Sequence, residues 1–478
     1  MTQPQTFAQT FDYLILGAGS AGLTFAAVAA QLGHKVALFE AHKMGGDCLN
    51  YGCVPSKAFI AAAKTGQDWA YAMAHIQQTI AAIAPHDSAE RFSKLGVTVI
   101  QQAASFVDDQ TVKTPDGQRY RGRRILIATG SSPFIPPVPG LSDTPYLTNE
   151  TFFSLAEPPK ELLILGGGPI GIELAQASAK LGTKVMVIEA GPTILSKDDP
   201  ELVAVVRANL EADGVTLLTG HKVVAAERTG DPNGEQNGGP NGGRIHLTLE
   251  ANGQQTTCSG THLLVAAGRQ PNVAGLNLDL AHVAYNQRGI IVNKAMRTSN
   301  KRIFAAGDVV GPFQFTHMAG YQAGLVIRRS LFGLITTKAS YNAVPWVSYT
   351  TPELAQIGLN EPAAKAMYGD NIRVTKVAYK DNDRAQTDGT TSGFAKLITT
   401  HKGKVLGVSI VGAQAGELIT PWSLVLSGKI KLSAMAGLVY PYPTLGDLNR
   451  QLASAFYQPS FYSPRTGWIS RWLSRLLG

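Results

Sequence analysis

Two of the three cysteines in the chain lie five positions apart, in the stretch GGDCLNYGCVPSK at residues 45–57. Cys48 and Cys53 could bind a metal, lie buried without a chemical role, or form a redox disulfide. Structural zinc takes four ligands, commonly from cysteine pairs two to four residues apart, and the chain has no second pair. A pair at i and i+5 can close a disulfide where the first turn of a helix is distorted, which Gly52 and Pro55 favour. We therefore interpret the pair as a redox disulfide and predict no metal site.

A glycine-rich turn precedes the thiols and indicates how a nucleotide could be bound beside them. Residues 12–40, DYLILGAGSAGLTFAAVAAQLGHKVALFE, predict a strand, a tight turn, an Ala-rich helix and a second strand. The glycines of the turn are Gly17, Gly19 and Gly22, and the second strand ends at Glu40. In such a unit the first glycine permits the turn, the second lets a pyrophosphate approach the backbone, and the third lets helix and strand pack closely. The helix N-terminus attracts the anion, and Glu40 can accept hydrogen bonds from a ribose.

The same pattern recurs at residues 161–189, ELLILGGGPIGIELAQASAKLGTKVMVIE. Its glycines are Gly166, Gly168 and Gly171, and its second strand ends at Glu189. Two complete units predict two bound nucleotides, and the alternative is one site and one structural relic. A carboxylate at Glu189 would repel the 2′-phosphate of NADP and accept a hydrogen bond from the free 2′-hydroxyl of NAD. We therefore favour NAD(H) over NADP for the second unit.

The length and composition are those of a multidomain globular protein. The 478 residues correspond to about three domains of roughly 150 residues each. The 50 glycines indicate the turns of α/β folds, and three cysteines do not form the disulfide framework of a secreted protein. The first residues, MTQPQTFAQTFDYLIL, lack the basic start and apolar run of a signal peptide, and no stretch of 18 apolar residues predicts a membrane span. The net charge of +8 is scattered, which argues against nucleic-acid binding, and we expect a cytoplasmic location.

Further motifs accompany the thiols and the glycine turns in a fixed order. They are ILIATGSSP at residues 125–133, LLVAAGRQPN at 263–272, IFAAGDV at 303–309 and PWVSYTTPELAQIGL at 345–359. With this set, the chain resembles the class I pyridine nucleotide-disulfide oxidoreductases over about residues 10–460. That family includes lipoamide dehydrogenase, glutathione reductase and mercuric reductase. The resemblance implies an α/β fold with two Rossmann-like nucleotide-binding domains, for FAD and NAD, and a C-terminal α+β dimerisation domain.

The resemblance also implies a division of the chain. We expect an FAD-binding domain with the redox disulfide at residues 1–150, an NAD-binding domain at 151–272, a central region completing the FAD domain at 273–342, a dimerisation domain at 343–460 and an amphipathic tail at 461–478. Within the NAD-binding domain, the segment GDPNGEQNGGPNGG at residues 230–243 is expected to form a surface loop.

Cofactor-binding roles follow from the same resemblance. The first glycine turn and Glu40 would hold the adenosine end of FAD. Asp308, in AGDV, would bind the ribityl or pyrophosphate region of FAD, and Gly130, in ATG, would lie near the crossover between domains. His317 would lie near the start of a helix aimed at the isoalloxazine ring, with a local structural role of its own. A helix N-terminus at that position would stabilise negative charge on the reduced flavin.

The resemblance assigns the redox roles as well. Cys48 would be the interchange thiol that attacks substrate, and Cys53 would lie over the flavin and form its charge-transfer complex. Lys57 would lie near the flavin N5, paired with Glu173. In the implied mechanism, NADH reduces FAD, FAD reduces the disulfide, and the dithiol passes two electrons to the substrate by thiol–disulfide exchange.

One C-terminal motif departs from the family pattern. Disulfide reductases of the family carry His-Pro-Thr and a nearby Glu, and the partner subunit supplies the histidine as an acid/base. Residues 440–450 read YPYPTLGDLNR, which places Tyr442 and Asp447 at those positions. A tyrosine, with an ordinary pKa of about 10, is a poor base at neutral pH. The family pattern still implies a homodimer in which Tyr442 acts from the opposite subunit.

Mercuric reductases also place a tyrosine in this region, and a soft metal ion needs thiolate ligands rather than a proton relay. They add a C-terminal cysteine pair that this chain lacks, since its third cysteine is Cys258, which we interpret as passive.

Close to the redox pair, Asp47 and Tyr51 replace the family's usual threonine and small apolar residue. Arg384 either faces a substrate channel or is solvated.

The C-terminal tail, RTGWISRWLSRLLG, predicts an amphipathic helix. Its apolar face would carry Trp468, Ile469, Trp472, Leu473 and Leu476. A short basic helix with tryptophans suits a membrane surface, and the alternative is a helix packed on the dimer.

The sequence therefore predicts a homodimeric flavoenzyme with FAD and NAD(H). Electrons would pass from NADH through Cys48 and Cys53 to a small-molecule or protein-bound disulfide. One alternative is a reductase of mercuric or another soft metal ion. A second is a carrier at the inner membrane surface that passes electrons from NADH to a quinone. A flavin-binding protein without turnover is disfavoured by the motif residues Lys57 and Glu173.

Overall fold

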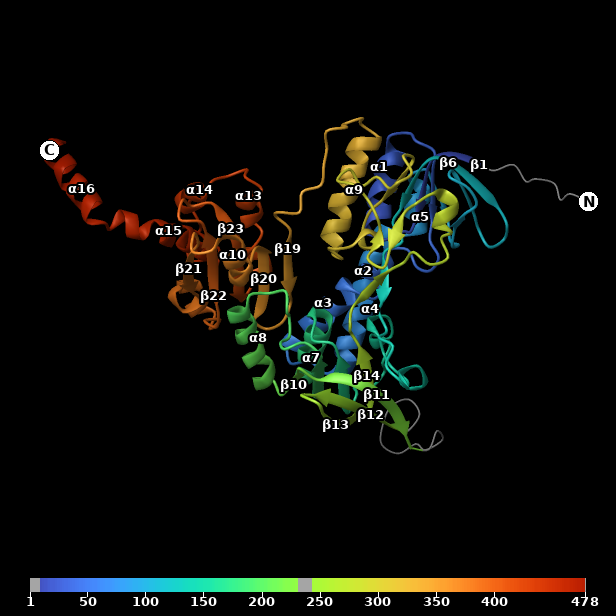
Figure 1. Ribbon diagram of the computed structural model, residues 1–478, viewed down its shortest axis with the longest axis horizontal. Coiled ribbons are helices and arrows are strands. Elements are labelled where there is room, and N and C mark those ends of the chain that lie inside the picture. The colour runs from blue at the N-terminus through green and yellow to red at the C-terminus, as the bar shows by residue number, and fades with distance from the viewer. Residues whose placement is uncertain (1–8, 231–242, 478) are drawn as a thin grey trace, which may run out of the picture. The chain divides into compact units, whose positions relative to one another are not determined.

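A computed structural model describes residues 9–230 and 243–477 of the chain (Figure 1). The chain divides into two compact units. Unit 1 comprises Met1–Ala190 and Gly220–Ser340, and unit 2 comprises Gly191–Thr219 and Tyr341–Gly478. The loop expected at residues 230–243 lies, apart from its two ends, outside the described residues.

The largest sheet of unit 1 has a parallel core. All four residues of β2, VALF, are buried, and such apolar runs are typical of parallel strands covered on both faces. The strand order is β3-β2-β1-β6-β5-β4, and β18 also pairs with β6. Strands β4 and β5 are antiparallel to their neighbours, and the other pairs are parallel. The strands are β1 (Gln9–Leu16), β2 (Val36–Phe39), β3 (Val97–Ile100), β4 (Ser105–Phe106), β5 (Thr111–Lys113), β6 (Arg119–Ile127) and β18 (Ile303–Ala305).

The carboxyl ends of four parallel strands in this sheet lie in register. Leu16 of β1 pairs with Phe39 of β2 and with Ile127 of β6, and Ile127 pairs in turn with Ala305 of β18. The segments that follow these strands therefore meet at one edge of the sheet. Open α/β sheets bind their ligands at such an edge.

Helices of unit 1 cover this sheet and carry the cysteine segment. Helices α1 and α9 pack side by side (Figure 1). The rings of Phe59, Trp69 and Phe152 meet edge to face and join α3, α4 and α6. The helices are α1 (Ser20–Gln31), α2 (Gly46–Asn50), α3 (Cys53–Lys64), α4 (Trp69–Asp87), α5 (Ala89–Lys94), α6 (Asn149–Phe152), α7 (Pro169–Lys180) and α9 (Thr316–Ser330).

Unit 1 contains a second parallel sheet, whose strand ends are also in register. Strand β8 (Glu161–Leu165) pairs with β9 (Lys184–Glu189) and β14 (His262–Val265), all parallel. Leu165 at the end of β8 pairs with Ile188 and with Val265. An antiparallel sheet of β11 (Lys222–Thr229), β12 (Arg244–Ala251) and β13 (Gln254–Gly260) accompanies it. Cys258 lies on β13, where burial raises the pKa of its thiol.

The smaller elements of unit 1 are two short strand pairs and three 3-10 turns. They are β7 (Ser131–Pro133) with β15 (Arg269–Pro271), β16 (Tyr285–Asn286) with β17 (Gly289–Ile290), η1 (Leu141–Asp143), η2 (Leu278–Ala281) and η3 (Asp308–Val310).

Unit 2 is an antiparallel sheet with helices packed on it. The sheet order is β19 (Pro345–Ser348), β20 (Glu353–Gly358), β23 (Val405–Gly412), β22 (Phe394–Thr399) and β21 (Arg373–Ala378). The remaining elements are α8 (Pro200–Ala212), β10 (Thr216–Thr219), α10 (Glu361–Tyr368), η4 (Tyr379–Asp381), α11 (Asp383–Thr387), α12 (Ala415–Leu418), α13 (Trp422–Leu426), α14 (Leu432–Gly437), α15 (Asp447–Phe461) and α16 (Pro464–Leu476).

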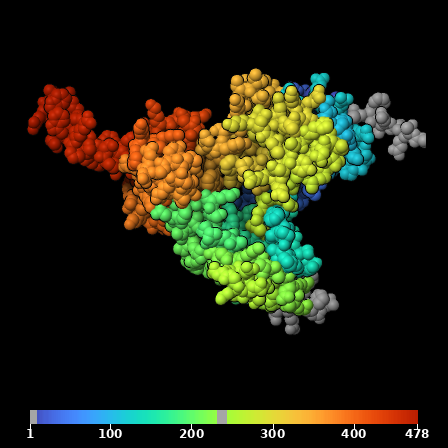
Figure 2. Space-filling view, viewed as in Figure 1, coloured from blue at the N-terminus to red at the C-terminus, as the bar shows by residue number. Residues whose placement is uncertain are grey.

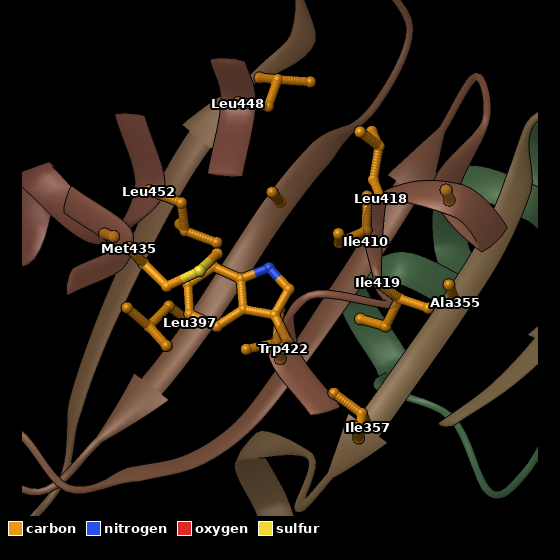
Figure 3. Close-up of a cluster of buried hydrophobic side chains, with 14 of the residues drawn as sticks. Ala355, Ile357, Leu397, Ile410, Leu418, Ile419, Trp422, Met435, Leu448 and Leu452 are labelled. Atoms are coloured by element: carbon orange, nitrogen blue, oxygen red, sulfur yellow. The ribbon is translucent and has the colours of Figure 1, made fainter. Parts of the chain in front are cut away.

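Trp422 lies at the centre of the core of unit 2, between the sheet and the helices (Figure 3). Its ring is fully buried, and its Nε1 donates a hydrogen bond to Asn449 Oδ1 at 2.8 Å. The bond satisfies the indole N–H, which would otherwise be buried without a partner.

A buried lysine ties α8 to the sheet of unit 2. Lys396 on β22 is 1% exposed, and its Nζ lies 3.0 and 2.9 Å from the two carboxylate oxygens of Asp199, which is itself fully buried. Glu201 and Glu361 each contribute an oxygen 2.6 Å from the same nitrogen. A buried charge persists only when it is paired in this way.

The predicted fold class is confirmed. Parallel strands with glycine turns and crossover helices form unit 1, and the C-terminal part of the chain is α+β. Among the described residues, no helix is long and apolar enough to cross a membrane.

Candidate functional site

The first glycine turn has the close approaches that the sequence predicts. Gly17 follows β1 with φ of +106°, and a Cβ there would clash with the carbonyl oxygen of Ala128. A Cβ on Gly22 would clash with the carbonyl oxygen of Gly17. At Gly19 the nearest atom to an added Cβ is Gly46 Cα, at 4.0 Å. The turn therefore packs tightly against the protein at Gly17 and Gly22, and the backbone of Gly19 remains open to a ligand.

The second turn repeats this pattern. Gly166 has φ of +117°, and a Cβ there would clash with the carbonyl oxygen of Ala266. A Cβ on Gly171 would clash with the carbonyl oxygen of Gly166, whereas none of the described atoms lies within 4 Å of one added to Gly168. Both turns therefore combine tight packing with an open approach to the backbone at the middle glycine.

Each turn is fixed by the acidic residue predicted to face a ribose. Glu40 follows β2, and its carboxylate accepts hydrogen bonds from the N–H groups of Ala18 and His42, both at 2.8 Å. Glu189 ends β9 and accepts a hydrogen bond from the N–H of Gly167 at 2.6 Å. The two carboxylates therefore lie at the same place in each unit, beside the backbone that would face a pyrophosphate.

Helix N-termini at these turns are free of side-chain caps. Helices α1, α7 and α9 begin after Gly19, Gly168 and Phe315, and none of the three has a side-chain cap hydrogen bond. Among the other described helices, some are capped, such as α4 by Asp68 and α8 by Asp199, and others, such as α14 and α15, are not. The first N–H groups of α1 and α7 are thus suited to phosphate groups, and those of α9 to another anionic group. These features fit FAD at the first turn and a pyridine nucleotide at the second.

Asp308 and Gly130 lie at the same edge of the large sheet. Asp308 begins the short helix after β18, and its Oδ2 accepts a hydrogen bond from Ser131 Oγ at 2.7 Å. Burial raises the pKa of Asp308. Gly130 adopts φ of +70° directly before Ser131. The structure therefore brings both predicted FAD-binding residues to the edge that the first glycine turn occupies.

Cys48 and Cys53 lie on either side of a break between two helices. Cys48 lies in α2 and Cys53 begins α3. The N–H groups of Tyr51 and Gly52 both donate to the carbonyl oxygen of Asp47, at 2.8 and 2.7 Å, and so close the intervening turn. The structure contains both cysteines as free thiols.

The two thiols differ in acidity. The hydrogen bond from Cys48 is the largest of the effects that lower the pKa of Cys53 to about 6, and Thr316 and Lys57 also lower it. The same hydrogen bond, together with burial, raises the pKa of Cys48. The surroundings of the pair, with Thr316 and Lys57 near Cys53, therefore favour the negative charge of the dithiol on Cys53.

Lys57 and Glu173 are brought together from α3 and α7. Lys57 Nζ lies 2.7 Å from Glu173 Oε2, and the glutamate side chain is 5% exposed while that of the lysine is 37% exposed. The pair places a positive charge one helical turn after Cys53, where it favours a thiolate.

Sequence reasoning missed Thr316 as a neighbour of the thiols. Its Oγ1 lies 3.3 Å from Cys53 Sγ, at the first residue of α9. His317 follows it and stacks on Phe315 with ring centroids 5.2 Å apart. The motif FTHMAG drew attention to the histidine, but no spacing rule connects Thr316 to a cysteine 263 residues away.

A polar network around Asp47 was also missed. Asp47 Oδ2 lies 3.3 Å from Arg269 NH2, and Asp47 Oδ1 accepts a hydrogen bond from Asn149 Nδ2 at 3.2 Å. Arg269 also donates to Ser131 Oγ at 2.8 Å, and Ser131 in turn donates to Asp308. The residue that replaces the family's usual threonine therefore links the helix of Cys48 to the cofactor edge of the sheet.

Tyr442 and Asp447 lie in unit 2 and have different partners. Tyr442 is 77% exposed, and its hydroxyl donates a hydrogen bond to Asp383 Oδ2 at 2.7 Å. This bond raises the pKa of Tyr442 above its ordinary value. Asp447 instead accepts hydrogen bonds from Arg450 and Gln451, at 2.6 and 2.9 Å.

Tyr442 and Asp447 therefore bind different partners and are not hydrogen-bonded to each other. Arg384, the other candidate in this region, pairs with Asp388 at 2.7 Å. Among the described residues there is no group of three or more His, Cys, Asp and Glu side chains that could hold a metal ion.

Comparison with known proteins agrees with this geometry. Residues 11–323 match the family model of the pyridine nucleotide-disulphide oxidoreductases, and residues 344–452 match the model of their dimerisation domain. The chain is 32% identical over 457 residues to a mercuric reductase of Staphylococcus aureus, covering 91% of this chain and 81% of that protein. It is 32% identical over 468 residues to a dihydrolipoyl dehydrogenase of Geobacillus stearothermophilus, covering 94% and 96%.

A solved structure shares the fold. The HOCl-induced flavoprotein disulfide reductase RclA from Escherichia coli superposes with a TM-score of 0.83 at 27% identity, covering 93% of this chain and 99% of that one. A Cu(II) complex of the same reductase gives a TM-score of 0.84. The family model and these relatives confirm the resemblance stated from the sequence. With two nucleotide cradles, a cysteine pair and a dimerisation domain, the chain belongs to the pyridine nucleotide-disulphide oxidoreductase family, whose flavoenzymes use FAD and a pyridine nucleotide.

Proposed function

We propose that the protein is an NADH-dependent reductase that passes two electrons through Cys48 and Cys53 to a disulfide substrate. The observation that carries the proposal is the arrangement of groups around the two thiols. Cys53 begins α3, its Sγ lies 3.3 Å from Thr316 Oγ1, and the ammonium group of Lys57 follows one helical turn later. These groups favour a thiolate at Cys53, and Cys48 lies five residues before it as its partner. A pair in which one thiol stores charge and the other exchanges with substrate is what thiol–disulfide exchange requires.

The chain supplies the exchange steps. FAD, which the first glycine turn, Glu40 and Asp308 would hold, would supply the two electrons of NADH to the Cys48–Cys53 disulfide. Cys48, once deprotonated, attacks one sulfur of the substrate disulfide, which forms a mixed disulfide and releases one thiol. The thiolate of Cys53 then attacks Cys48 Sγ, which closes the Cys48–Cys53 disulfide and releases the second thiol. In total, the dithiol gives two electrons to the substrate disulfide and is itself oxidised to the Cys48–Cys53 disulfide. The two thiols released take one proton from Cys48 and one from solvent.

Lys57 and Glu173 have a supporting role in this proposal. The ammonium group of Lys57 stabilises the thiolate of Cys53, and the buried carboxylate of Glu173 holds that ammonium group in place. Thr316 holds the thiolate by a hydrogen bond from the opposite helix.

The preferred reductant is NADH. Glu189 accepts a hydrogen bond from the second glycine turn, so its carboxylate is held at the position predicted for the ribose. A 2′-phosphate would meet that carboxylate, whereas a free 2′-hydroxyl could donate to it.

An anaerobic titration with NADH tests the proposal. If the dithiol takes part, the first two electrons produce a long-wavelength absorbance band from the Cys53 thiolate beside oxidised flavin. Cys48→Ser should retain a thiolate at Cys53 but lose turnover with disulfide acceptors. Direct bleaching of the flavin, with no band and with turnover intact in Cys48→Ser, would contradict the proposal.

A soft metal ion is the second candidate acceptor, and one observation favours it. The hydroxyl of Tyr442 donates a hydrogen bond to Asp383, which raises the pKa of Tyr442, so this tyrosine is poorly suited to remove the proton of Cys48. A soft metal ion binds thiolates directly and displaces their protons without a base. Parallel assays with lipoamide, glutathione disulfide, Hg(II) and Cu(II) distinguish the two candidates.

The functional form is proposed to be a homodimer. The dimerisation domain matched at residues 344–452 supports this assembly. In the proposed dimer, Tyr442 of each subunit faces the cysteine pair of the other. Mass measurement of the FAD-bound protein in solution tests the assembly.

A quinone at a membrane surface is the third candidate acceptor, and it is proposed together with a peripheral membrane location. The exposed apolar face of α16 favours it, as argued below. Cys48→Ser should leave quinone reduction intact but abolish disulfide or metal reduction.

A further inference from the structure

Helix α16 has no buried residue. It spans Pro464–Leu476 and extends away from the rest of unit 2, where it protrudes in the space-filling view (Figure 2). Its large apolar side chains are open to solvent; the exposed fractions are 63% for Trp468, 38% for Ile469, 52% for Trp472, 42% for Leu473 and 62% for Leu476. Monomeric proteins rarely expose several large apolar side chains together unless the surface has a partner.

The exposed side chains form one face. Trp468, Trp472 and Leu476 recur at intervals of four, and Ile469 and Leu473 lie next to them on the helix surface. Ser470 and Ser474 lie on the opposite face. Two aromatic side chains just before the helix, Phe461 and Tyr462, are exposed as well, at 66% and 84%.

The charge of this segment is all of one sign. Residues 461–477 contain Arg465, Arg471 and Arg475 and no acidic residue. Arg471 and Arg475 flank the apolar face, where long arginine side chains can reach anionic groups while their stems cover apolar surface. An acidic surface with an apolar layer beneath it complements this arrangement.

The helix is defined before any partner binds. Ser463 caps it by accepting a hydrogen bond from Thr466 N–H at 3.2 Å, and Pro464 occupies the first turn. Thr466 Oγ1 also donates to the carbonyl oxygen of Ser460 in α15 at 2.7 Å, which fixes the start of α16 on the preceding helix. A preformed helix loses less conformational entropy when it binds than a disordered tail would.

The segment lies outside the family's shared parts. The dimerisation-domain match ends at residue 452, before α16 begins. The helix is therefore not part of the machinery that the family model describes.

We propose that α16 binds in the plane of an anionic membrane surface, with Trp468, Trp472 and Leu476 in the acyl boundary and Arg471 and Arg475 against lipid headgroups. Short basic helices with tryptophans on an apolar face bind membranes in this manner. Tryptophan prefers the boundary between headgroups and acyl chains, and arginines gain affinity from anionic lipids. The inference stands on the exposed apolar face and the arginines of α16, and it is independent of the redox chemistry.

Vesicle binding by the FAD-bound full chain tests the proposal. We expect cosedimentation with vesicles of phosphatidylcholine containing 30% phosphatidylglycerol, at least tenfold weaker binding to pure phosphatidylcholine, and a further loss when salt screens the charges. Brominated lipids should quench the fluorescence of Trp468 and Trp472.

Two paired variants separate the contributions. R471E/R475E should lower the partition coefficient at least tenfold. K402E/K429E makes the same change of net charge at exposed lysines of unit 2 and should leave binding within twofold of the unaltered protein. W468S/W472S should abolish the fluorescence quenching, and all three variants should retain turnover with a soluble acceptor.

Two results would overturn the proposal. One is the absence of binding to anionic vesicles by a protein that is active and dimeric. The other is dissociation of the dimer on removal of residues 464–478, together with tryptophans already shielded from aqueous quenchers without lipid, because α16 would then pack on the partner subunit. Loss of turnover with vesicle binding intact would count against the redox proposal alone.

Discussion

The hydroxyl of Thr316, at the first residue of α9, lies 3.3 Å from the Sγ of Cys53, at the first residue of α3. Two helix N-termini therefore meet at the thiol that carries the charge of the dithiol. Both helix dipoles favour a negative group there, and Thr316 adds a hydrogen bond to it. The acidity of Cys53 thus depends on a helix far away in sequence as well as on the cysteine motif itself.

Thr316→Val should make the Cys53 thiol a weaker acid. The hydrogen bond from Cys48 is the largest effect that lowers the pKa of Cys53, and the variant loses the second hydrogen bond that lowers it, from the Thr316 hydroxyl. A hydrogen bond to a charged group contributes about 1.5–3 kcal/mol, which corresponds to an acid dissociation constant about 10- to 150-fold smaller. The thiolate forms as pH rises through its pKa, so the long-wavelength band of the two-electron-reduced enzyme should appear at higher pH in this variant.

Thr316→Ser is the matched control for this experiment. It keeps the hydroxyl and should keep the pH dependence of the unaltered protein. Identical titration curves for the valine and serine variants would show that the hydroxyl does not hold the thiolate.

Glu189→Ala should relax the preference for NADH. The variant removes the carboxylate that is fixed by the Gly167 N–H. Loss of the repulsion toward a 2′-phosphate should raise kcat/KM for NADPH relative to NADH about tenfold, equivalent to about 1.4 kcal/mol. The ratio of the two kcat/KM values is the measurement.

Glu40→Ala changes the corresponding carboxylate of the first unit and serves as its control. It should weaken retention of FAD during gel filtration and leave the ratio of NADPH to NADH activity unchanged. If Glu40→Ala also changed the ratio of NADPH to NADH activity, the preference for NADH could not be assigned to the second glycine turn.

Tyr442→His should raise disulfide reduction more than metal reduction. A histidine can act as a base near neutral pH, and positioned general bases contribute about 10²–10⁴-fold. We expect at least a tenfold gain in lipoamide turnover and less than a threefold change with Hg(II). Tyr442→Phe removes only the hydroxyl that donates to Asp383, and it should leave both activities within about threefold. A large loss of disulfide reduction in Tyr442→Phe would show that the tyrosine itself takes part.

Asp198→Asn should stabilise the protein at alkaline pH. Burial raises the pKa of Asp198 from 3.8 to about 6, so the folded protein binds this proton more tightly than the unfolded chain. The resulting stability is present below the unfolded pKa and is lost as pH rises through about 6. The asparagine removes that loss, at most about 2–3 kcal/mol, and its amide oxygen can still accept the hydrogen bond from Trp346.

The measurement is the unfolding temperature at pH 5 and pH 8, with Asp370→Asn as an exposed control in the same unit. The gain of Asp198→Asn over the unaltered protein should be larger at pH 8. An equal gain at both pH values would exclude the ionisation of Asp198 as its cause.

Local patterns in the sequence were enough to predict the two glycine turns and their acidic residues. Gly17, Gly166 and the acidic residues that follow each second strand are close in sequence, and their backbone requirements are set by short-range sterics. Cys53 and Lys57 lie in the first turns of α3 and Cys48 lies five residues before Cys53, so their proximity also followed from spacing.

Contacts between distant segments could not be predicted in this way. Thr316 reaches Cys53 only because α9 and α3 converge, and Arg269 reaches Asp47 across unit 1. Asp383, at the start of α11, accepts a hydrogen bond from Tyr442 in the loop between α14 and α15. Periodicity does not encode such side-chain pairs, because they depend on how whole elements pack.

The buried Lys396 has a consequence for any attempt to express the C-terminal part of the chain alone. Its partner Asp199 comes from residues 191–219, which belong to unit 2 although the chain returns to unit 1 afterwards. A fragment that begins at Tyr341 would keep the ammonium group and lose the fully buried carboxylate, and removing one partner of a buried pair costs about 3–5 kcal/mol. A self-sufficient fragment would have to carry residues 191–219 joined to it through a linker.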